Sequence, residues 1–281
     1  MKIKRRFIDI SIGSVHYYTA NENSIEAQEL PVILMPASPF SARVLNPLTL
    51  EISKSRTAIA FDHLGQGDSC CPDEHEPDIS YFSKKLIECL DVLEIKKADF
   101  YGTHTGAHIV MDLAINFPDR VHKIILDGIG LPSKELKDKY INNLMKPIPI
   151  DLYGSQWLWS FQIIKDMYCF FPYFERDSSH RRVRSLPSND ELHDQALDLL
   201  KNSSTYHLAY IAAFKNNQNG ESFSKITVPT LLTGASKDVS IKAFEEVARI
   251  IPKCDPLPYP ENIEPGDFVS ISKFLCEWLD I

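Results

Sequence analysis

The chain has 281 residues, 44% of them hydrophobic and 24% charged, and its formal net charge is -8. This composition predicts one large globular domain, or one domain with a sizeable insertion, and the negative charge argues against nucleic acid as a partner. No apolar run reaches the roughly 18 residues that a membrane-spanning helix needs, and the basic start lacks the apolar core of a signal peptide. The six cysteines show no spacing typical of a metal site or a disulfide framework. We expect a cytoplasmic protein with no metal, no cofactor and no contact with a membrane.

Short apolar segments alternate with helical patterns along the first half of the chain. Three mostly apolar runs are typical of strands buried on both faces, and an alternating pattern around Gly13 predicts a β-hairpin. The alternation of strand and helix predicts a parallel sheet with helices on both sides. We expect the hairpin at residues 5–19, buried strands at 31–35, 57–61 and 121–128, and a helix at 79–93.

Residues 98–117 predict a strand, a sharp turn and a helix, and the rest of the chain is organised around them. Phe100 and Tyr101 end a β-favouring run, the sequence Gly-Thr-His-Thr-Gly follows at 102–106, and apolar residues then recur at helical spacing. Glycines are needed on both sides of such a turn because a Cβ there would strike the neighbouring strand or helix. This is the pattern of a nucleophile elbow, in which the middle residue projects above the sheet. Here the middle residue is His104.

The pattern changes after about residue 131. Residues 131–225 are rich in helix formers and aromatic residues and contain no convincing buried strand. The alternation then resumes, and Asp238 follows the next apolar strand. We expect this strand at 226–234, then a helix at 241–251, a short strand at 256–260 and a closing helix at 266–279.

The elbow glycines, the loop Asp-x-x-Gly-x-Gly-x-Ser at residues 62–69 and the placement of Asp238 together resemble the α/β-hydrolase superfamily. The resemblance covers almost the whole chain, and the Gly-Thr-His-Thr-Gly elbow is also similar to that of cap-bearing hydrolase-like proteins. It implies a mostly parallel, doubly wound α/β sheet with an inserted helical cap. The implied core is 1–130 with 226–281, and the implied cap is 131–225.

The chain departs from the superfamily pattern at two triad positions. The superfamily places Ser, Cys or Asp where this chain has His104, and its base histidine lies in a loop that corresponds here to residues 259–265, which contain no histidine. Asp238 alone stands where the resemblance implies the triad acid. An elbow imidazole projects further than a serine hydroxyl and can fill the gap left by the missing base. We therefore predict that His104 contacts Asp238 directly, and that the carboxylate fixes its tautomer and raises its basicity.

The resemblance also suggests residues that would assist such a pair. Backbone N–H groups of Thr105 and of Ala37 or Ser38 would form an oxyanion hole, since Pro36 has no N–H to donate. For substrate binding the candidates are His63, in a loop at the pocket mouth of this fold, and Trp157 and Trp159, in an aromatic-rich part of the cap. The alternatives are an ordinary loop histidine and aromatic residues that only pack the cap.

The basic run at residues 180–184 is expected to be a solvated face. The alternative is that one of its arginines binds a carboxylate, for which the guanidinium group is well suited.

A His-Asp pair with an oxyanion hole can activate water on an ester or thioester, or remove a proton beside a carbonyl. The leading prediction is therefore a hydrolase whose partner is a small hydrophobic carbonyl compound. One alternative is a cofactor-independent lyase or isomerase that uses His104 as acid and base. Another is a non-catalytic protein that binds a small molecule, because fold does not imply function and histidine tolerates positive φ better than most residues.

Overall fold

The structure, a computed structural model, describes residues 2–20, 29–182, 185–216, 220–236, 238–264 and 266–279. Within these ranges eight strands form one sheet, in the order β1-β2-β4-β3-β5-β6-β7-β8. β1 and β2 form the predicted antiparallel hairpin, β2 runs antiparallel to β4, and the remaining neighbours are parallel. The strands are β1 (Lys4–Ile10), β2 (Gly13–Thr19), β3 (Val32–Met35), β4 (Ala58–Phe61), β5 (Ala98–Thr103), β6 (Val121–Asp127), β7 (Thr230–Thr233) and β8 (Cys254–Pro256).

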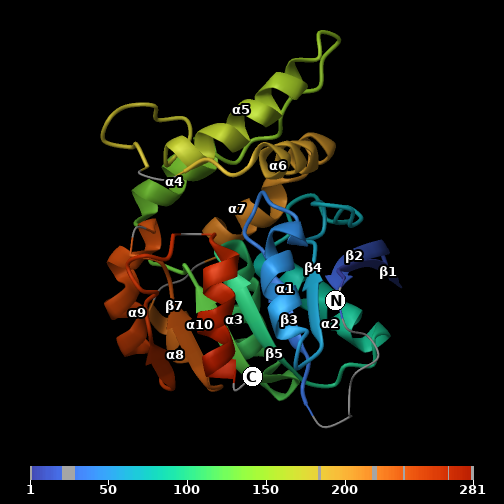
Figure 1. Cartoon of the computed structure of the whole chain (residues 1–281), viewed down its shortest axis with the longest axis vertical. Helices are drawn as coiled ribbons and strands as arrows, with labels where there is room; N and C mark the ends of the chain where they lie inside the picture. The colour runs from blue at the N-terminus through green and yellow to red at the C-terminus, as the bar shows by residue number, and fades with distance from the viewer. Residues whose placement is uncertain are drawn as a thin grey trace.

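Helices cover both faces of this sheet (Figure 1). Because successive side chains of a strand point to opposite faces, Ile33 and Met35 of β3 belong to one buried cluster, while Val32 and Leu34 belong to another. The first cluster includes residues of α2, α3 and α9, and the second includes residues of α1 and α10. The helices outside the 131–225 segment are α1 (Asn46–Ile52), α2 (Ile79–Val92), α3 (Thr105–Asn116), α9 (Phe244–Ile250) and α10 (Phe268–Leu279), with 3-10 turns η1 (Ala42–Leu45), η2 (Pro118–Arg120) and η3 (Val239–Ala243).

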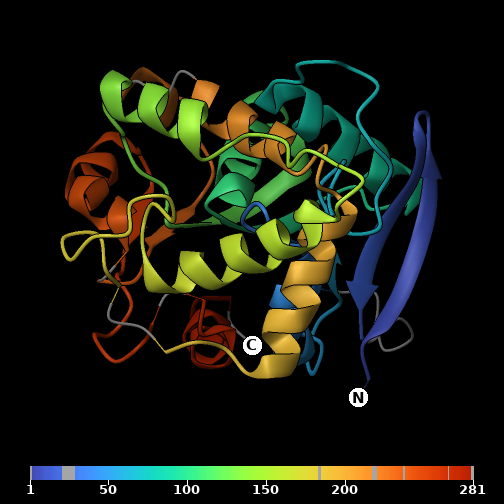
Figure 2. The ribbon, with the colours of Figure 1, turned by 90° about the horizontal axis from the view of Figure 1, so that it is seen from above.

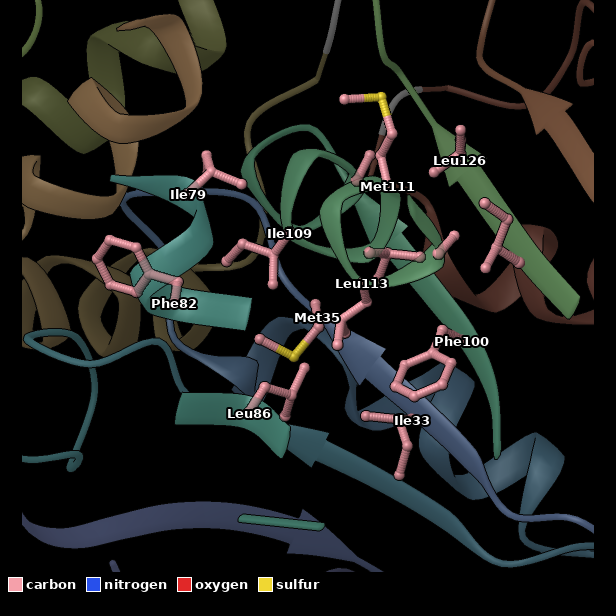
Figure 3. Close-up of a cluster of buried hydrophobic side chains, with 14 of the residues drawn as sticks. Ile33, Met35, Ile79, Phe82, Leu86, Phe100, Ile109, Met111, Leu113 and Leu126 are labelled. Atoms are coloured by element: carbon pink, nitrogen blue, oxygen red, sulfur yellow. The ribbon is translucent and has the colours of Figure 1, made fainter. Parts of the chain in front are cut away.

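Helix α2 shows how local sequence and packing agree. Asp78 caps it by accepting a hydrogen bond from the backbone N–H of Tyr81 at 2.7 Å, which satisfies one of the N–H groups that a helix start leaves unpaired. Phe82, Leu86 and Leu90 then recur on one face and are almost fully buried. Phe82 and Leu86 lie in the cluster drawn in Figure 3, which also contains residues of β3, β5 and α3. Each such side chain contributes about 1.5–3 kcal/mol by leaving water.

Between β6 and β7 the chain forms further helices, and α4, α5 and α6 lie above the sheet in Figure 1. α5 and α6 share one buried cluster and pack together in the view from above (Figure 2). α4 belongs to a second cluster, to which α7 contributes Tyr210. α7 also packs on the main domain, since its small residues Ala209, Ala212 and Ala213 belong to the same cluster as α2 and α3. The helices are α4 (Lys134–Asn143), α5 (Ser155–Cys169), α6 (Asn189–Lys201), α7 (His207–Lys215) and α8 (Gly220–Ser224).

Two predicted elements differ from the structure near the end of the chain. The helix expected at 241–251 is divided into η3 and α9, because Asp238 caps a 3-10 turn by accepting the N–H of Ser240. The strand expected at 256–260 is β8, which ends at Pro256. Pro258 and Pro260 follow, and proline cannot donate to a strand ladder.

No helix in the described ranges is both long enough and apolar enough to cross a bilayer.

Candidate active site

The elbow between β5 and α3 has the geometry that its glycines predict. His104 has a φ of 46°, in the left-handed region, and its N–H donates to the carbonyl oxygen of Asp127 at 2.8 Å. A Cβ on Gly102 would lie 2.4 Å from the backbone of Gly106, and one on Gly106 would lie 2.2 Å from the carbonyl oxygen of Met35. Both distances are far inside van der Waals contact, so the elbow closes only with glycine at these positions.

The structure brings His104 and Asp238 together. The Nε2 atom of His104 lies 3.3 Å from Oδ2 of Asp238, which follows β7. The other carboxylate oxygen, Oδ1, accepts hydrogen bonds from the N–H and the hydroxyl of Ser240, at 2.9 and 2.6 Å. The Asp238 side chain is only 6% exposed, whereas the His104 side chain is 39% exposed because it opens into a cavity. A fixed, buried carboxylate thus faces an accessible imidazole.

Gly128 provides the seat for the His104 ring. This glycine follows β6 with a φ of 73°, and a Cβ placed on it would lie 2.7 Å from Cε1 and 3.0 Å from Nδ1 of His104. Any side chain at position 128 would therefore push the imidazole away from its present position. The short distance to Asp238 depends on this glycine as well as on the elbow itself.

The two charged groups stabilise each other. Burial lowers the pKa of the His104 imidazole, but the charge of Asp238 and its hydrogen bond outweigh burial, so the pKa of His104 is raised above its ordinary value. Burial alone would raise the pKa of Asp238, but the charge of His104 and the hydrogen bonds from His104 and Ser240 hold it well below its usual range. The pair therefore favours imidazolium and carboxylate over two neutral groups.

The loop after β3 lies against the start of α3. The N–H of Ser38 donates to the hydroxyl oxygen Oγ1 of Thr105 at 3.3 Å, so this N–H is already engaged. The N–H groups of Ala37 and Thr105 have no hydrogen-bond partner among the described residues. Pro36 holds the loop in place, because its carbonyl oxygen accepts from the N–H of Gly106 at 3.1 Å. Of the two predicted donors in this loop, the structure leaves Ala37 available.

A cavity of about 1370 Å³ lies above the elbow. It is larger than the roughly 300–1,000 Å³ of ordinary ligand pockets, and His104, Thr105, Ala37, Ser38 and Asp238 lie on its wall. Much of the wall that the 131–225 segment contributes is aromatic. The aromatic residues on this part of the wall are Tyr140, Tyr168, Phe171, Tyr210 and Phe214.

Two further polar side chains face the same cavity near His104. Arg182 lies over the ring of Phe171, with its guanidinium carbon 5.6 Å from the ring centre, and among the described residues no carboxylate pairs with it. His108 lies one turn along α3. Burial, with the nearby charges of His104 and Lys137, lowers the pKa of His108 to about 3, so this second imidazole is neutral. Residues 183 and 184 of the predicted basic run lie outside the described part of the chain.

The structure does not place His63 on the cavity wall. This side chain is buried, with 2% exposure, and its Nε2 lies 2.7 Å from the carbonyl oxygen of Pro36. Burial lowers the pKa of His63 to about 4, so the neutral ring donates its Nε2 proton to that carbonyl. His63 therefore supports the loop that carries Ala37, and its side chain lies off the wall of the cavity in which we expect substrate.

The structure also does not place Trp157 and Trp159 on the cavity wall. They lie on the outer side of α5 with 62% and 51% of their surfaces exposed. The structure brings neither tryptophan to the cavity, because α5 turns other residues inward. Tyr140, Tyr210 and Phe214 line the cavity from α4 and α7, although they lie outside the aromatic-rich segment in which the sequence predicts substrate contacts.

No cluster of three or more His, Cys, Asp or Glu side chains suited to a metal ion occurs in the described ranges.

No protein-family model matches the chain. A 2-hydroxymuconate semialdehyde hydrolase from a Pseudomonas species is 38% identical over 78 residues, which make up 28% of this chain and 28% of that protein. The match thus spans less than a third of that relative. A cis-3-alkyl-4-alkyloxetan-2-one decarboxylase from Shewanella oneidensis is 22% identical over 282 residues, covering 99% of this chain and 78% of that protein.

Solved structures give a likeness over the whole chain. The crystal structure of an epoxide hydrolase from Vigna radiata superposes with a TM-score of 0.75 at 15% sequence identity, covering 99% of this chain and 98% of that one. At such low identity the likeness shows the fold. Together with the strand order and the elbow, it establishes that the chain has the α/β-hydrolase fold, mostly parallel and doubly wound.

Proposed function

We propose that the protein is a hydrolase that cleaves esters or thioesters of hydrophobic carbonyl compounds, with His104 and Asp238 as its catalytic pair. The observation that carries this proposal is the 3.3 Å separation between the imidazole and a buried carboxylate at the floor of a large cavity. The relative named as a 2-hydroxymuconate semialdehyde hydrolase supports hydrolysis as the reaction type.

In the proposed reaction His104 acts as the general base. Its Nε2–H donates to Asp238, which leaves the lone pair on Nδ1 to accept a proton from a water molecule. The water oxygen attacks the carbonyl carbon as that proton leaves. Asp238 stays ionised and stabilises the imidazolium, which then returns the proton to the departing alkoxide or thiolate. No serine takes part, so no acyl-enzyme forms.

Two backbone donors would stabilise the negative oxygen of the intermediate. We propose the N–H groups of Ala37 and Thr105, both on the cavity wall and both without a partner in the described structure. Ser38 is the weaker candidate because its N–H is engaged by the Thr105 hydroxyl. Fixed N–H groups are effective here because they need no reorientation when the charge develops.

Helices α4, α5 and α6 would act as the cap that holds the substrate. The aromatic wall from Tyr140, Phe171, Tyr210 and Phe214 suits an aryl or long alkyl group. Arg182 on the cavity wall could bind a carboxylate of the substrate. It lies close enough to His104 for its charge to lower the pKa of the imidazole. We therefore propose hydrophobic acyl compounds as the substrate class.

The test is turnover by wild type and by His104→Ala on p-nitrophenyl esters and acyl thioesters, with folding checked by circular dichroism. His193→Ala is the matched control, because His193 is exposed on α6 and does not line the cavity. We expect His104→Ala to lose at least about 10²-fold in kcat/KM while His193→Ala keeps full activity. Equal activity in all three proteins would refute the proposal. Labelling by a fluorophosphonate would show that a serine is the nucleophile instead.

A second candidate is a cofactor-independent lyase, favoured by the likeness over nearly the whole chain to a protein named as a decarboxylase. The same His104 would then move a proton at the carbon beside a carbonyl, and the donors at Ala37 and Thr105 would stabilise an enolate. β-Dicarbonyl compounds incubated in heavy water distinguish the two candidates. Carbon–carbon cleavage or deuterium incorporation without ester turnover would favour the lyase. Binding without any turnover, unchanged in Asp238→Asn, would indicate a binding protein.

A further inference from the structure

A second buried carboxylate lies beneath the elbow and takes no direct part in the reaction proposed above. Asp127, the last residue of β6, is 6% exposed. Its Oδ2 accepts a hydrogen bond from the hydroxyl of Tyr101 at 2.6 Å and from that of Tyr259 at 3.0 Å. Both tyrosines are almost fully buried. Two hydroxyl groups on one carboxylate oxygen make an unusual arrangement in an otherwise apolar layer between the sheet and α10.

The hydrogen bonds define the charge of this group. Burial, and then the charge of Asp127, raise the pKa of both Tyr101 and Tyr259 well above the ordinary value, so both hydroxyls keep their protons. Each hydroxyl has one proton, and both point to the same oxygen of Asp127, which therefore acts only as an acceptor. Burial raises the pKa of Asp127 above its ordinary value, and the Tyr101 bond, the charge of His104 and the Tyr259 bond limit this rise. The tyrosines thus replace the water that an exposed carboxylate would have.

Asp127 is tied to His104 through both backbone and charge. Its carbonyl oxygen accepts the N–H of His104 at 2.8 Å, and the next residue, Gly128, is the seat of the imidazole ring. The charges around His104 are Asp238 and Asp127, which favour the imidazolium, and Arg182, which disfavours it. His108, which also faces the cavity, is neutral. Asp127 ends β6 and Asp238 follows β7, the strand paired with β6, so both carboxylates come from the same edge of the sheet.

We infer that Asp127 is a second carboxylate of the site, which Tyr101 and Tyr259 keep ionised and which supports the positive charge of His104. It is a positioning residue, because it acts through the imidazole and does not touch the substrate. Tyr259 lies in the very loop in which the superfamily resemblance implies a base histidine. The inference rests on the proposed role of His104 as the base, but its test below does not require turnover.

The test is an NMR titration of the His104 imidazole in the full chain, assigned by comparison with His104→Ala. Asp127→Asn keeps the shape and the acceptor oxygen while removing the charge, so we expect the His104 midpoint to move to lower pH. The double variant Tyr101→Phe/Tyr259→Phe removes both donors, so the carboxyl takes up a proton and the midpoint moves the same way. In the Asp127→Asn background the tyrosine substitutions should cause no further shift, because the charge through which they act is gone.

The matched control is Tyr206→Phe. It removes a buried tyrosine hydroxyl that donates to the carbonyl oxygen of Lys146 at 2.6 Å and that makes no hydrogen bond to Asp127 or His104 among the described contacts. It should leave the midpoint unchanged. If Asp127→Asn fails to fold, the tyrosine double variant carries the test. A His104 midpoint that stays fixed or rises in these variants, with only thermal stability reduced, would make Asp127 a structural residue and overturn the inference. Failure of ester turnover with the midpoint shift intact would refute the proposed function alone.

Discussion

The cavity has a floor, formed by the elbow and Asp238, and a roof, formed by the helices of residues 131–225, and the two are built in different ways. On the floor, His104 is fixed by a strained turn, a backbone bond to Asp127, a glycine seat and a buried carboxylate. On the roof, α5 turns large apolar side chains to solvent, with Trp157 62% and Leu158 71% exposed. The floor has few alternative arrangements, whereas the roof tolerates many. This contrast teaches that backbone geometry fixes the proposed catalytic groups, while the proposed selectivity depends on the side chains of the roof.

The largest expected effect comes from the floor. Gly106→Ala places a Cβ 2.2 Å from the carbonyl oxygen of Met35, and two backbone segments must separate to accept it. We expect a loss of more than about 3 kcal/mol in the free energy of unfolding, or failure to fold, measured by urea denaturation. Ala107→Gly, at a buried position next to it in α3, is the control and should cost about 1 kcal/mol. A stable Gly106→Ala protein would show that the floor is less rigid than described.

The next effect concerns the proposed catalytic pair, His104 and Asp238. Asp238→Asn removes the charge that raises the pKa of His104, so kcat/KM should fall by about 10²-fold or more. Because the base must be neutral, wild-type activity should decline as the pH falls through a His104 pKa above the ordinary value of about 6.5. In Asp238→Asn this decline should move to lower pH. Asp166→Asn, a buried carboxylate of α5 outside the cavity, should leave the profile unchanged.

Much of the floor could be predicted from the sequence, because it depends on short sequence patterns. The spacing of Gly102 and Gly106 defines the elbow, and Asp238 follows an apolar strand at a fixed place in the fold. The ring seat at Gly128 could not be predicted, since it depends on how β6 ends beside the elbow. The loop at His63 shows a related limit. Sequence indicates a polar residue near the pocket, but only the bond to Pro36 shows that the ring points inward.

The orientation of α5 in the roof could not be predicted, because its sequence does not show which side of the helix is buried. Residues 157–161 of α5 are apolar at nearly every position, so helical periodicity does not say which side is buried. The buried residues prove to be Ser160, Ile163, Ile164, Asp166 and Tyr168. Tyr210 and Phe214 reach the cavity from α7, whose alanines pack on the main core. That packing brings together residues that are distant in sequence, and no local sequence pattern predicts it.

A smaller effect is expected on the roof. Phe214→Ala removes part of the aromatic wall, so the KM for an aryl ester should rise about tenfold while kcat changes little, since burial of an aromatic ring is worth a few kcal/mol at most. Phe161→Ala removes the same side chain from the outer face of α5, where it is 42% exposed, and should leave KM unchanged. A tenfold loss of kcat in Phe214→Ala would mean that this side chain also affects the chemical step at His104.

The smallest effect is expected for Trp157→Ala. Its side chain is 62% exposed and lies outside the cavity, so the free energy of unfolding should change by less than about 0.5 kcal/mol and KM should be unaffected. Thermal melts and steady-state kinetics check this. A raised KM would mean that the outer side of α5 meets the substrate after all.

The central claim is that the elbow imidazole and Asp238 form one charge-coupled unit. The most direct measurement is the NMR titration of His104 in the wild type and in Asp238→Asn. The claim predicts a wild-type midpoint above that of an ordinary histidine and a clear fall in the variant. A midpoint at or below the ordinary value, unmoved by the loss of the carboxylate, would contradict it.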